Sequence, residues 1–249
     1  MRTDGVLWGR RTSIALLLCT AMALTSCSSE KKEADGVPAA KLCDSSLTSD
    51  AADALEKISS GGRYRETALS LDKAAVRLRD SGDTSTSRST VCTVYTSKEG
   101  TEVRLFQIEF VRPDAGAEWP PELDPDDSYY SSGIYAESST EDAFIAFPCT
   151  AGLRKHGPPV VAGVLVPDSG NVAQKLLDAE RRHAYMVMLH SASRALADKL
   201  GCLAEAGLPV KLPEASPHTD YRKPPSLKTL EKEFVAGRAP DARKSKGSA

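Results

Sequence analysis

Few side chains of this chain stand at the spacings that catalysis requires. Many serine hydrolases carry the nucleophile in a Gly-x-Ser-x-Gly turn, and the sequence contains no such turn. His183 and His190 lie seven residues apart, which on a helix separates them by about 10 Å along the axis. That is too far for two ligands of one metal ion. We therefore expect a protein that is not an enzyme, and we expect no bound metal or cofactor.

Acidic residues and aromatic rings are concentrated in one segment. Residues 113–142 contain nine acidic residues and no basic residue. The segment Asp124-Pro125-Asp126-Asp127-Ser128 offers oxygen ligands at alternating positions, as calcium loops do. Tyrosines stand where an EF-hand needs glycine and glutamate, so we expect a metal-free acidic loop. The rings could form an exposed binding surface with the acids, or they could anchor the loop on a sheet. The residues of this candidate surface are Trp119, Asp124, Asp126, Asp127, Tyr129, Tyr130 and Tyr135.

The N-terminus has the pattern of an export signal. Arg2, Arg10 and Arg11 precede an uncharged apolar run over residues 14–24. A membrane-spanning helix needs about 20 apolar residues, so these 11 are the length of a signal-peptide core instead. We expect the general secretion route, with twin-arginine export as the alternative because of the Arg10-Arg11 pair.

The four residues that follow, Leu24-Thr25-Ser26-Cys27, resemble the lipobox of bacterial lipoproteins. The resemblance implies that Cys27 is joined to a diacylglycerol and that the signal is cleaved after Ser26. It also implies a lipid anchor in the cell membrane, on the extracytoplasmic face, and it says nothing about an activity.

The remaining cysteines indicate disulfides. Export would remove Cys19 and lipidation would occupy Cys27, which leaves Cys43, Cys92, Cys149 and Cys202. An even number of cysteines in an oxidising compartment favours disulfide bonds, and their spacing fits no zinc site. We prefer the pairs Cys43–Cys92 and Cys149–Cys202, because each joins a helical segment to a strand within one half of the chain. Crossed pairings remain alternatives.

The hydrophobic patterns predict an α+β fold. We expect an antiparallel sheet of about five strands, packed against a long C-terminal helix and short N-terminal helices and closed by two disulfides. The expected strands cover residues 90–96, 102–111, 131–136, 143–149 and 159–166, and the expected helices cover residues 49–58, 70–79 and 171–205.

The domain organisation follows from composition. We expect a signal peptide over residues 1–26, a lipidated flexible tether over 27–40 and an ectodomain over 41–208. A Pro-rich and basic C-terminal tail over 209–249, with a short helix over 227–236, completes the chain.

The sequence predicts a class of function and no specific activity. Loss of residues 1–26 removes three arginines and one aspartate, so the formal charge changes from −2 to −4, which does not favour nucleic-acid binding. The cysteine pattern and Leu200-Gly201-Cys202 loosely resemble small disulfide-containing envelope lipoproteins of unknown function from high-GC Gram-positive bacteria. We expect a non-catalytic module that binds an envelope protein or a wall component. The alternatives are a small-ligand or ion-binding accessory protein of a membrane transporter, and an enzyme with an unrecognised site.

Overall fold

The computed structural model describes most of the chain after residue 35. The described residues are 36–59, 61–80, 88–98, 101–114, 123–150, 153, 158–168, 176–216, 221 and 224–235. They belong to one compact unit, Ala34–Ala249, which is separate from Met1–Glu33. The expected export signal and Cys27 therefore lie outside the described residues.

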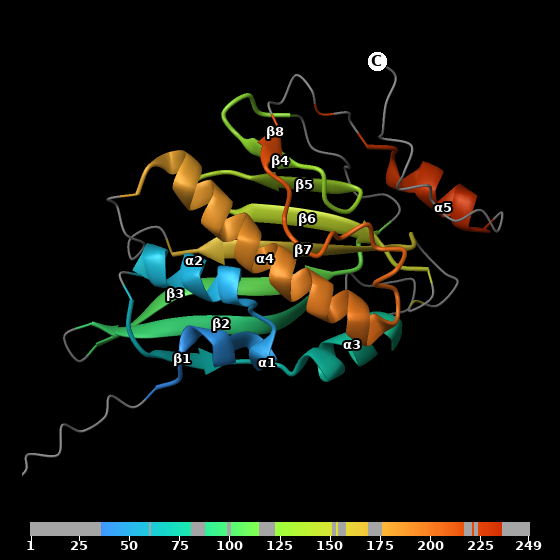
Figure 1. The fold of residues 1–249 in the computed structure, drawn as a ribbon. Coiled ribbons are helices and arrows are strands. Elements are labelled where there is room, and N and C mark those ends of the chain that lie inside the picture. Colours follow the sequence, from blue (N-terminus) through green and yellow to red (C-terminus); the bar gives the residue numbers. More distant parts are fainter. Residues whose placement is uncertain are drawn as a thin grey trace, which may run out of the picture. The chain divides into compact units, whose positions relative to one another are not determined.

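One antiparallel sheet organises the fold (Figure 1). Within the described residues it has eight strands, in the order β1-β2-β3-β7-β6-β5-β4-β8. Their bounds are β1 Tyr64–Thr67, β2 Arg88–Lys98, β3 Thr101–Val111, β4 Ser128–Tyr130, β5 Tyr135–Ser138, β6 Ala143–Pro148, β7 Val160–Pro167 and β8 Ala215–Ser216.

The expected count of about five strands was wrong. The segments β1, β4 and β8 have only four, three and two residues, too few to show the alternation by which a strand is predicted. Of the segment expected as a strand over residues 131–136, residues 131–134 lie between β4 and β5, and residues 135–136 are the first two of β5.

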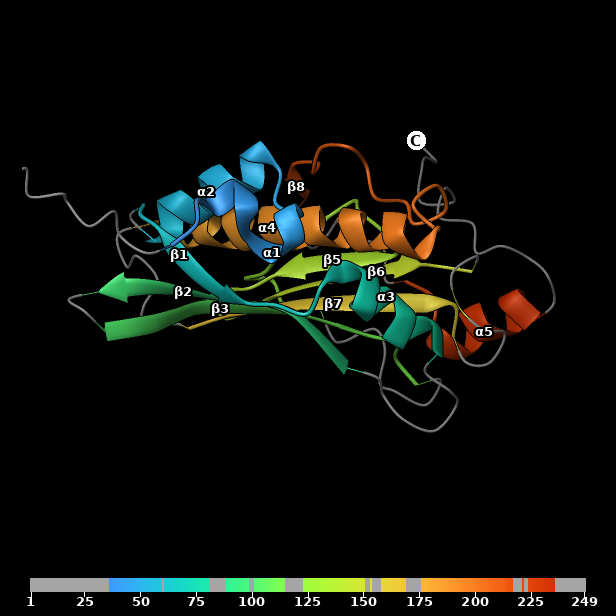
Figure 2. The same ribbon diagram turned by 90° about the horizontal axis from the view of Figure 1, so that it is seen from below.

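Helices lie on both faces of the sheet. They are α1 (Leu42–Ser45), α2 (Ser49–Ser59), α3 (Leu71–Asp80), α4 (Asp178–Leu200) and α5 (Leu227–Val235), with a 3-10 turn η1 over Ala39–Lys41. Figure 2 shows α2 and α4 on one side of the sheet and α5 toward the other side. Gly163 in the central strand β7 lets α4 approach, because a Cβ there would lie 2.6 Å from the Phe110 ring and 3.2 Å from Leu189.

The long helix is α4, and it is neither as long nor as C-terminal as expected. It begins at Asp178 instead of residue 171, where the Leu177 N–H donates to the Glu180 carboxylate (3.1 Å). It ends at Leu200 and is followed by Gly201, whose φ of 79° is the left-handed conformation that favours glycine at a helix end. The chain then continues through β8 and α5.

The folded domain extends beyond both ends of the expected ectodomain, residues 41–208. Val37 pairs with Tyr64 of β1 and Ala39 is buried, so residues 36–40 belong to the fold and not to a tether. At the other end, β8 pairs with β4 and Leu227 and Leu230 of α5 are buried. The described part of residues 209–235 is therefore packed on the domain instead of forming a tail.

The two expected disulfides are present. Cys43–Cys92 joins α1 to β2, and Cys149–Cys202 joins the end of β6 to the end of α4, with the partners 49 and 53 positions apart in the sequence. The pairing within each half of the chain is confirmed. None of the described helices is long and apolar enough to cross a membrane.

Removing either disulfide should cost much of the stability of the fold. Loops of this length are expected to stabilise by roughly 4 kcal/mol each. We predict a loss of that order when Cys43 and Cys92 are both replaced by alanine, measured by urea unfolding. Cys149→Ala with Cys202→Ala is the matched comparison. A loss below about 1 kcal/mol for either pair would show that the cross-link contributes little.

Candidate functional site

The acidic loop lies directly before β4. Its turn is closed locally, because the Asp126 N–H donates to the Asp124 carboxylate (2.9 Å) and the Asp127 N–H donates to the Asp124 carbonyl (3.2 Å). Asp124 and Asp126 are exposed, and Asp127 is half-buried. Burial, with the negative charge of Asp124 and Asp142, raises the pKa of Asp127, and Arg182 of α4 opposes the rise.

The tyrosines of this segment are buried, so the prediction that their rings form an exposed binding surface was wrong. Tyr129, Tyr130 and Tyr135 are each at most 1% exposed. The Tyr129 hydroxyl accepts from the Asp124 N–H (2.7 Å) and donates to the Asp124 carbonyl (2.9 Å). These rings therefore anchor the acidic loop on the sheet, which was the alternative. Trp119 lies outside the described residues.

The rings divide between the two faces of the sheet. Tyr130 belongs to the large core beneath α4 and lies 6.2 Å from the His183 ring. Tyr129 and Tyr135 face the other way, where Tyr221 packs at centroid distances of 5.0 and 5.7 Å from them. Alternation along short strands places neighbouring residues on opposite faces, so a set of rings close in sequence is split in space.

Glu137 is the chemically unusual group of this region, and the sequence did not single it out. It lies on β5 opposite Tyr129 of β4 and Phe144 of β6, and the Tyr135 hydroxyl donates to its carboxylate. Burial, supported by the charges of Asp127, Asp142 and Asp124, raises the pKa of Glu137 to about 7, against a lowering by the Tyr135 hydrogen bond. This carboxyl therefore gains and loses its proton near neutral pH.

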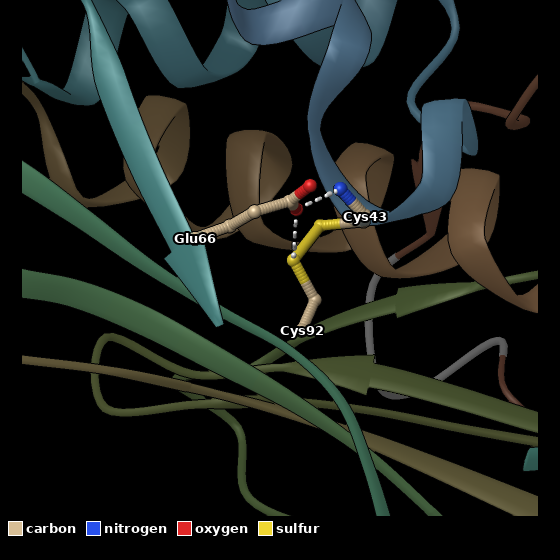
Figure 3. A group of neighbouring side chains, drawn as sticks. All are labelled: Cys43, Glu66 and Cys92. Atoms are coloured by element: carbon tan, nitrogen blue, oxygen red, sulfur yellow. Dashed lines mark hydrogen bonds between the residues drawn. A yellow bond between two sulfur atoms is a disulfide. The ribbon is translucent and has the colours of Figure 1, made fainter. Parts of the chain in front are cut away.

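Each disulfide lies beside a glutamate. Glu66 of β1 accepts a hydrogen bond from the Cys43 N–H (2.5 Å), and its Oε2 is 3.6 Å from the Cys92 Sγ (Figure 3). Glu205 accepts from the Thr150 N–H (2.5 Å), next to Cys149, and lies with Cys149 and Cys202 in one group. Disulfide sulfurs lack the thiolate that binds a soft metal, so in these two groups the carboxylates hold backbone next to a cross-link.

The first of these groups includes a left-handed turn. Cys43, Asp44 and Ser45 have φ angles of 54°, 60° and 57°, a conformation that costs an L-residue roughly 1–2 kcal/mol. The turn is held by the disulfide, by Glu66 and by the Asp44 carboxylate, which accepts from the Leu71 N–H at the start of α3 (3.1 Å). Its strain is therefore compensated by contacts with β1, β2 and α3.

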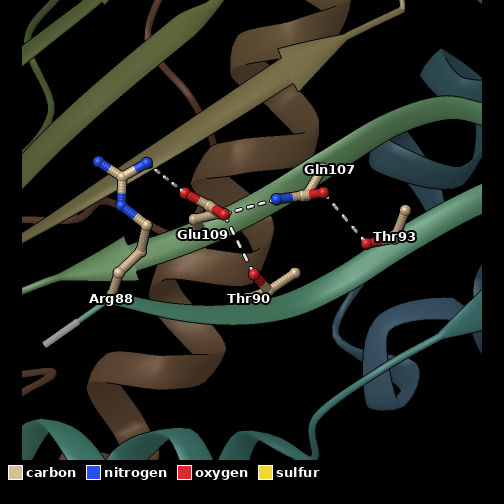
Figure 4. A network of polar contacts seen from close by, with 5 residues as sticks. All are labelled: Arg88, Thr90, Thr93, Gln107 and Glu109. Atoms are coloured by element: carbon tan, nitrogen blue, oxygen red, sulfur yellow. Dashed lines mark hydrogen bonds and ion pairs between the residues drawn. The ribbon is translucent and has the colours of Figure 1, made fainter.

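On β2 and β3, polar side chains form a network of hydrogen bonds with one another (Figure 4). Glu109 accepts from Arg88 (3.0 Å), Thr90 (3.1 Å) and Gln107 (2.5 Å). Its side chain is only 14% exposed. The network satisfies a carboxylate on the sheet face and joins the two strands.

The two helix histidines differ in environment. His183 is exposed, whereas His190 is 4% exposed and its Nε2 has no hydrogen-bond partner among the described residues. Burial, and then the charge of Arg194, lowers the pKa of His190 to about 4. His190 is therefore held neutral in the folded protein.

Relief of the left-handed turn should stabilise the protein. Ser45 is exposed and carries a φ of 57°. We predict that Ser45→Gly raises the free energy of unfolding by about 1 kcal/mol, because glycine adopts this conformation without a Cβ clash. Ser45→Ala is the control and should give no gain. An equal effect of both changes in thermal or urea unfolding would contradict a strained turn.

The buried His190 and the half-buried Glu137 should make stability depend on pH with opposite signs. The pKa of His190 falls from 6.5 to about 4 on folding, so the unfolded chain binds more protons between these values and stability rises with pH. The pKa of Glu137 rises from 4.5 to about 7, so the folded chain binds more protons there and stability falls as pH rises. Each effect is at most about 3 kcal/mol.

Single variants should separate the two effects. Between about pH 4.5 and pH 6.5, we predict that the free energy of unfolding of Glu137→Gln increases with pH, because His190 remains. In His190→Leu it should decrease with pH, because Glu137 remains. Urea unfolding at a series of pH values measures both slopes. Slopes of the same sign in the two variants would contradict one of the two assignments.

The comparisons with known proteins identify no family for this chain. No model of a protein family, no curated protein and no solved structure matches the chain. Any function has to be argued from the cross-linked fold and the groups described above.

Proposed function

We propose that this chain is an exported lipoprotein, anchored in the cell membrane through Cys27, whose disulfide-bonded domain is a non-catalytic binding module of the cell envelope. The observation that carries the proposal is the pair of disulfides, Cys43–Cys92 and Cys149–Cys202. Disulfides persist in oxidising compartments outside the cytoplasm and are rare within it. They therefore favour export independently of the N-terminal pattern.

The geometry of the N-terminal end is compatible with anchoring. Within the described residues, Val37 is the first that forms a β-bridge, and it lies against β1 at one edge of the sheet. Residues 28–36 between it and Cys27 number nine and reach at most about 30 Å when fully extended. The proposal thus attaches the β1 edge near the bilayer, with β4 and β8 at the opposite edge of the sheet.

The clustered carboxylates have structural roles, and this favours a binding role over catalysis. The carboxylates of Glu66 and Glu205 hold backbone beside disulfides, and that of Glu109 joins two strands. Serving as fixed acceptors, they maintain the shape of the domain. A domain of this kind, rigid and cross-linked, suits recognition of a protein or wall component.

The first test is the mass of the chain extracted from membranes of the producing cell. We expect a mature protein that begins at Cys27 and carries the mass of the lipid. Cys27→Ser should remain unlipidated. A mature N-terminus at any other residue would overturn the anchor.

The second test addresses binding. Cross-linking in living cells, followed by purification and mass spectrometry, should recover a stoichiometric envelope partner with the anchored chain and not with Cys27→Ser. Recovery of no partner by the anchored chain would contradict an interaction module and favour the small-ligand alternative.

A further inference from the structure

The C-terminal part of the chain covers the side of the sheet that α4 does not. We call Tyr221 and residues 224–235 the C-terminal cover. Leu227 and Leu230 of α5 are each 2% exposed and belong to one apolar cluster with Ala146, Val160 and Ala162 of β6 and β7. Ser226 directly precedes the helix, and its hydroxyl accepts from the Thr229 N–H (3.3 Å).

Tyr221 connects this cover to β5. Its ring packs on Tyr129 and Tyr135, and its hydroxyl accepts a hydrogen bond from the Ala136 N–H (3.1 Å). Ala136 lies between Tyr135 and Glu137 in the sequence. Burial, and in part the charge of Glu137, raises the pKa of Tyr221 to about 12, which places the Glu137 carboxyl within electrostatic reach of the cover.

The groups around Glu137 disfavour its ionised form. Tyr129 of β4 and Phe144 of β6 flank it, and Tyr221 lies on the adjacent rings. The hydrogen bond that Tyr135 donates acts in the other direction and favours the ionised carboxylate. Asp124 and Asp127 before β4 and Asp142 before β6 act on it with like charge. Arg182 of α4 is directed at this region through Ser128 (3.0 Å) and lowers the pKa of Asp127.

We propose that the C-terminal cover is a pH-responsive element, docked on the sheet while Glu137 is protonated and loosened when Glu137 ionises. An ionised carboxylate requires water or donors, and Tyr221 of the cover packs on Tyr135, whose hydroxyl donates to Glu137. A cover that favours the protonated carboxyl must itself bind more weakly to the ionised form, because the two equilibria are coupled reciprocally. Loosening exposes the apolar sheet face formed by Tyr129, Tyr135, Ala146, Val160 and Ala162.

The size of the effect follows from the same coupling. If docking of the cover raises the pKa of Glu137 by one pH unit, the equilibrium constant for docking falls tenfold when the carboxyl ionises. The proposal does not depend on the lipid anchor or on export, so its failure would leave the proposed function untouched.

Hydrogen exchange of the Ala136 amide tests the proposal directly, because that N–H donates to Tyr221. The measurement uses the full chain at about pH 6 and about pH 8.5. The Val37 amide, which donates to the Tyr64 carbonyl (2.8 Å) beside β1 at the far edge, serves as the internal reference for the intrinsic pH effect. We expect the protection of Ala136 relative to Val37 to fall at least about tenfold at the higher pH.

Three variants make the result specific. Glu137→Gln should keep the relative protection of Ala136 constant within about twofold, whereas the exposed neighbour Glu141→Gln should behave as the unmodified chain. Leu230→Asp should undock the cover and give low protection at both pH values. A constant ratio in the unmodified chain, an equal fall in Glu137→Gln, or full protection in Leu230→Asp would each overturn the proposal.

Discussion

The two disulfides are the constraint on which the arrangement of the layers depends. Cys43–Cys92 attaches the N-terminal helical segment to β2, and Cys149–Cys202 attaches the end of α4 to the end of β6. Each cross-link thus joins the helical layer to the sheet within one half of the chain. A left-handed turn of three L-residues is maintained at Cys43, where the cross-link and two carboxylates hold a backbone that would otherwise relax.

Neither disulfide joins the two halves of the chain, so that task falls to noncovalent packing. The ladder between β3 and β7 pairs Phe106–Val111 with Ala162–Pro167 in the middle of the sheet. On the helical side, the Ser191 hydroxyl of α4 donates to the Ser46 carbonyl (2.7 Å) and accepts from the Thr48 N–H (2.8 Å) before α2. A buried serine in a helix is explained by this bridge, because both backbone groups would otherwise lack a partner.

The opposite face of the sheet combines an apolar cluster with the Glu137 carboxyl. Its strands carry Tyr129, Tyr135 and Glu137, and the C-terminal residues Tyr221, Leu227 and Leu230 complete their packing. Burial of an acid among tyrosines and other acids keeps its proton near neutrality. His190 on the helical side is held neutral by burial as well, so the two faces respond to pH in opposite directions.

The sequence was sufficient for elements with a long pattern. The pairing of β2 with β3, the strands β6 and β7, and helices α2 and α3 follow from periodicity and β-branched or aromatic content. The start of α4 was misplaced because the apolar spacing continues before Asp178, whereas the backbone turns at Leu177.

Long-range contacts were beyond the reach of local patterns. Glu66 and Glu205 meet their cysteine-adjacent partners over 23 and 55 residues. Tyr221 reaches Ala136 over 85 residues. The burial of Tyr129 and Tyr135 depends on that late segment, so composition alone could not decide between an exposed surface and an anchored loop.

The central claim, a disulfide-bonded domain outside the cytoplasm, is tested most directly by peptide mapping without reduction. The chain is isolated from intact cells after free thiols have been blocked, digested and analysed by mass spectrometry. We predict peptides that join Cys43 to Cys92 and Cys149 to Cys202, with none of these four cysteines blocked. Blocked thiols at these positions, or a peptide that joins Cys92 to Cys149, would contradict it.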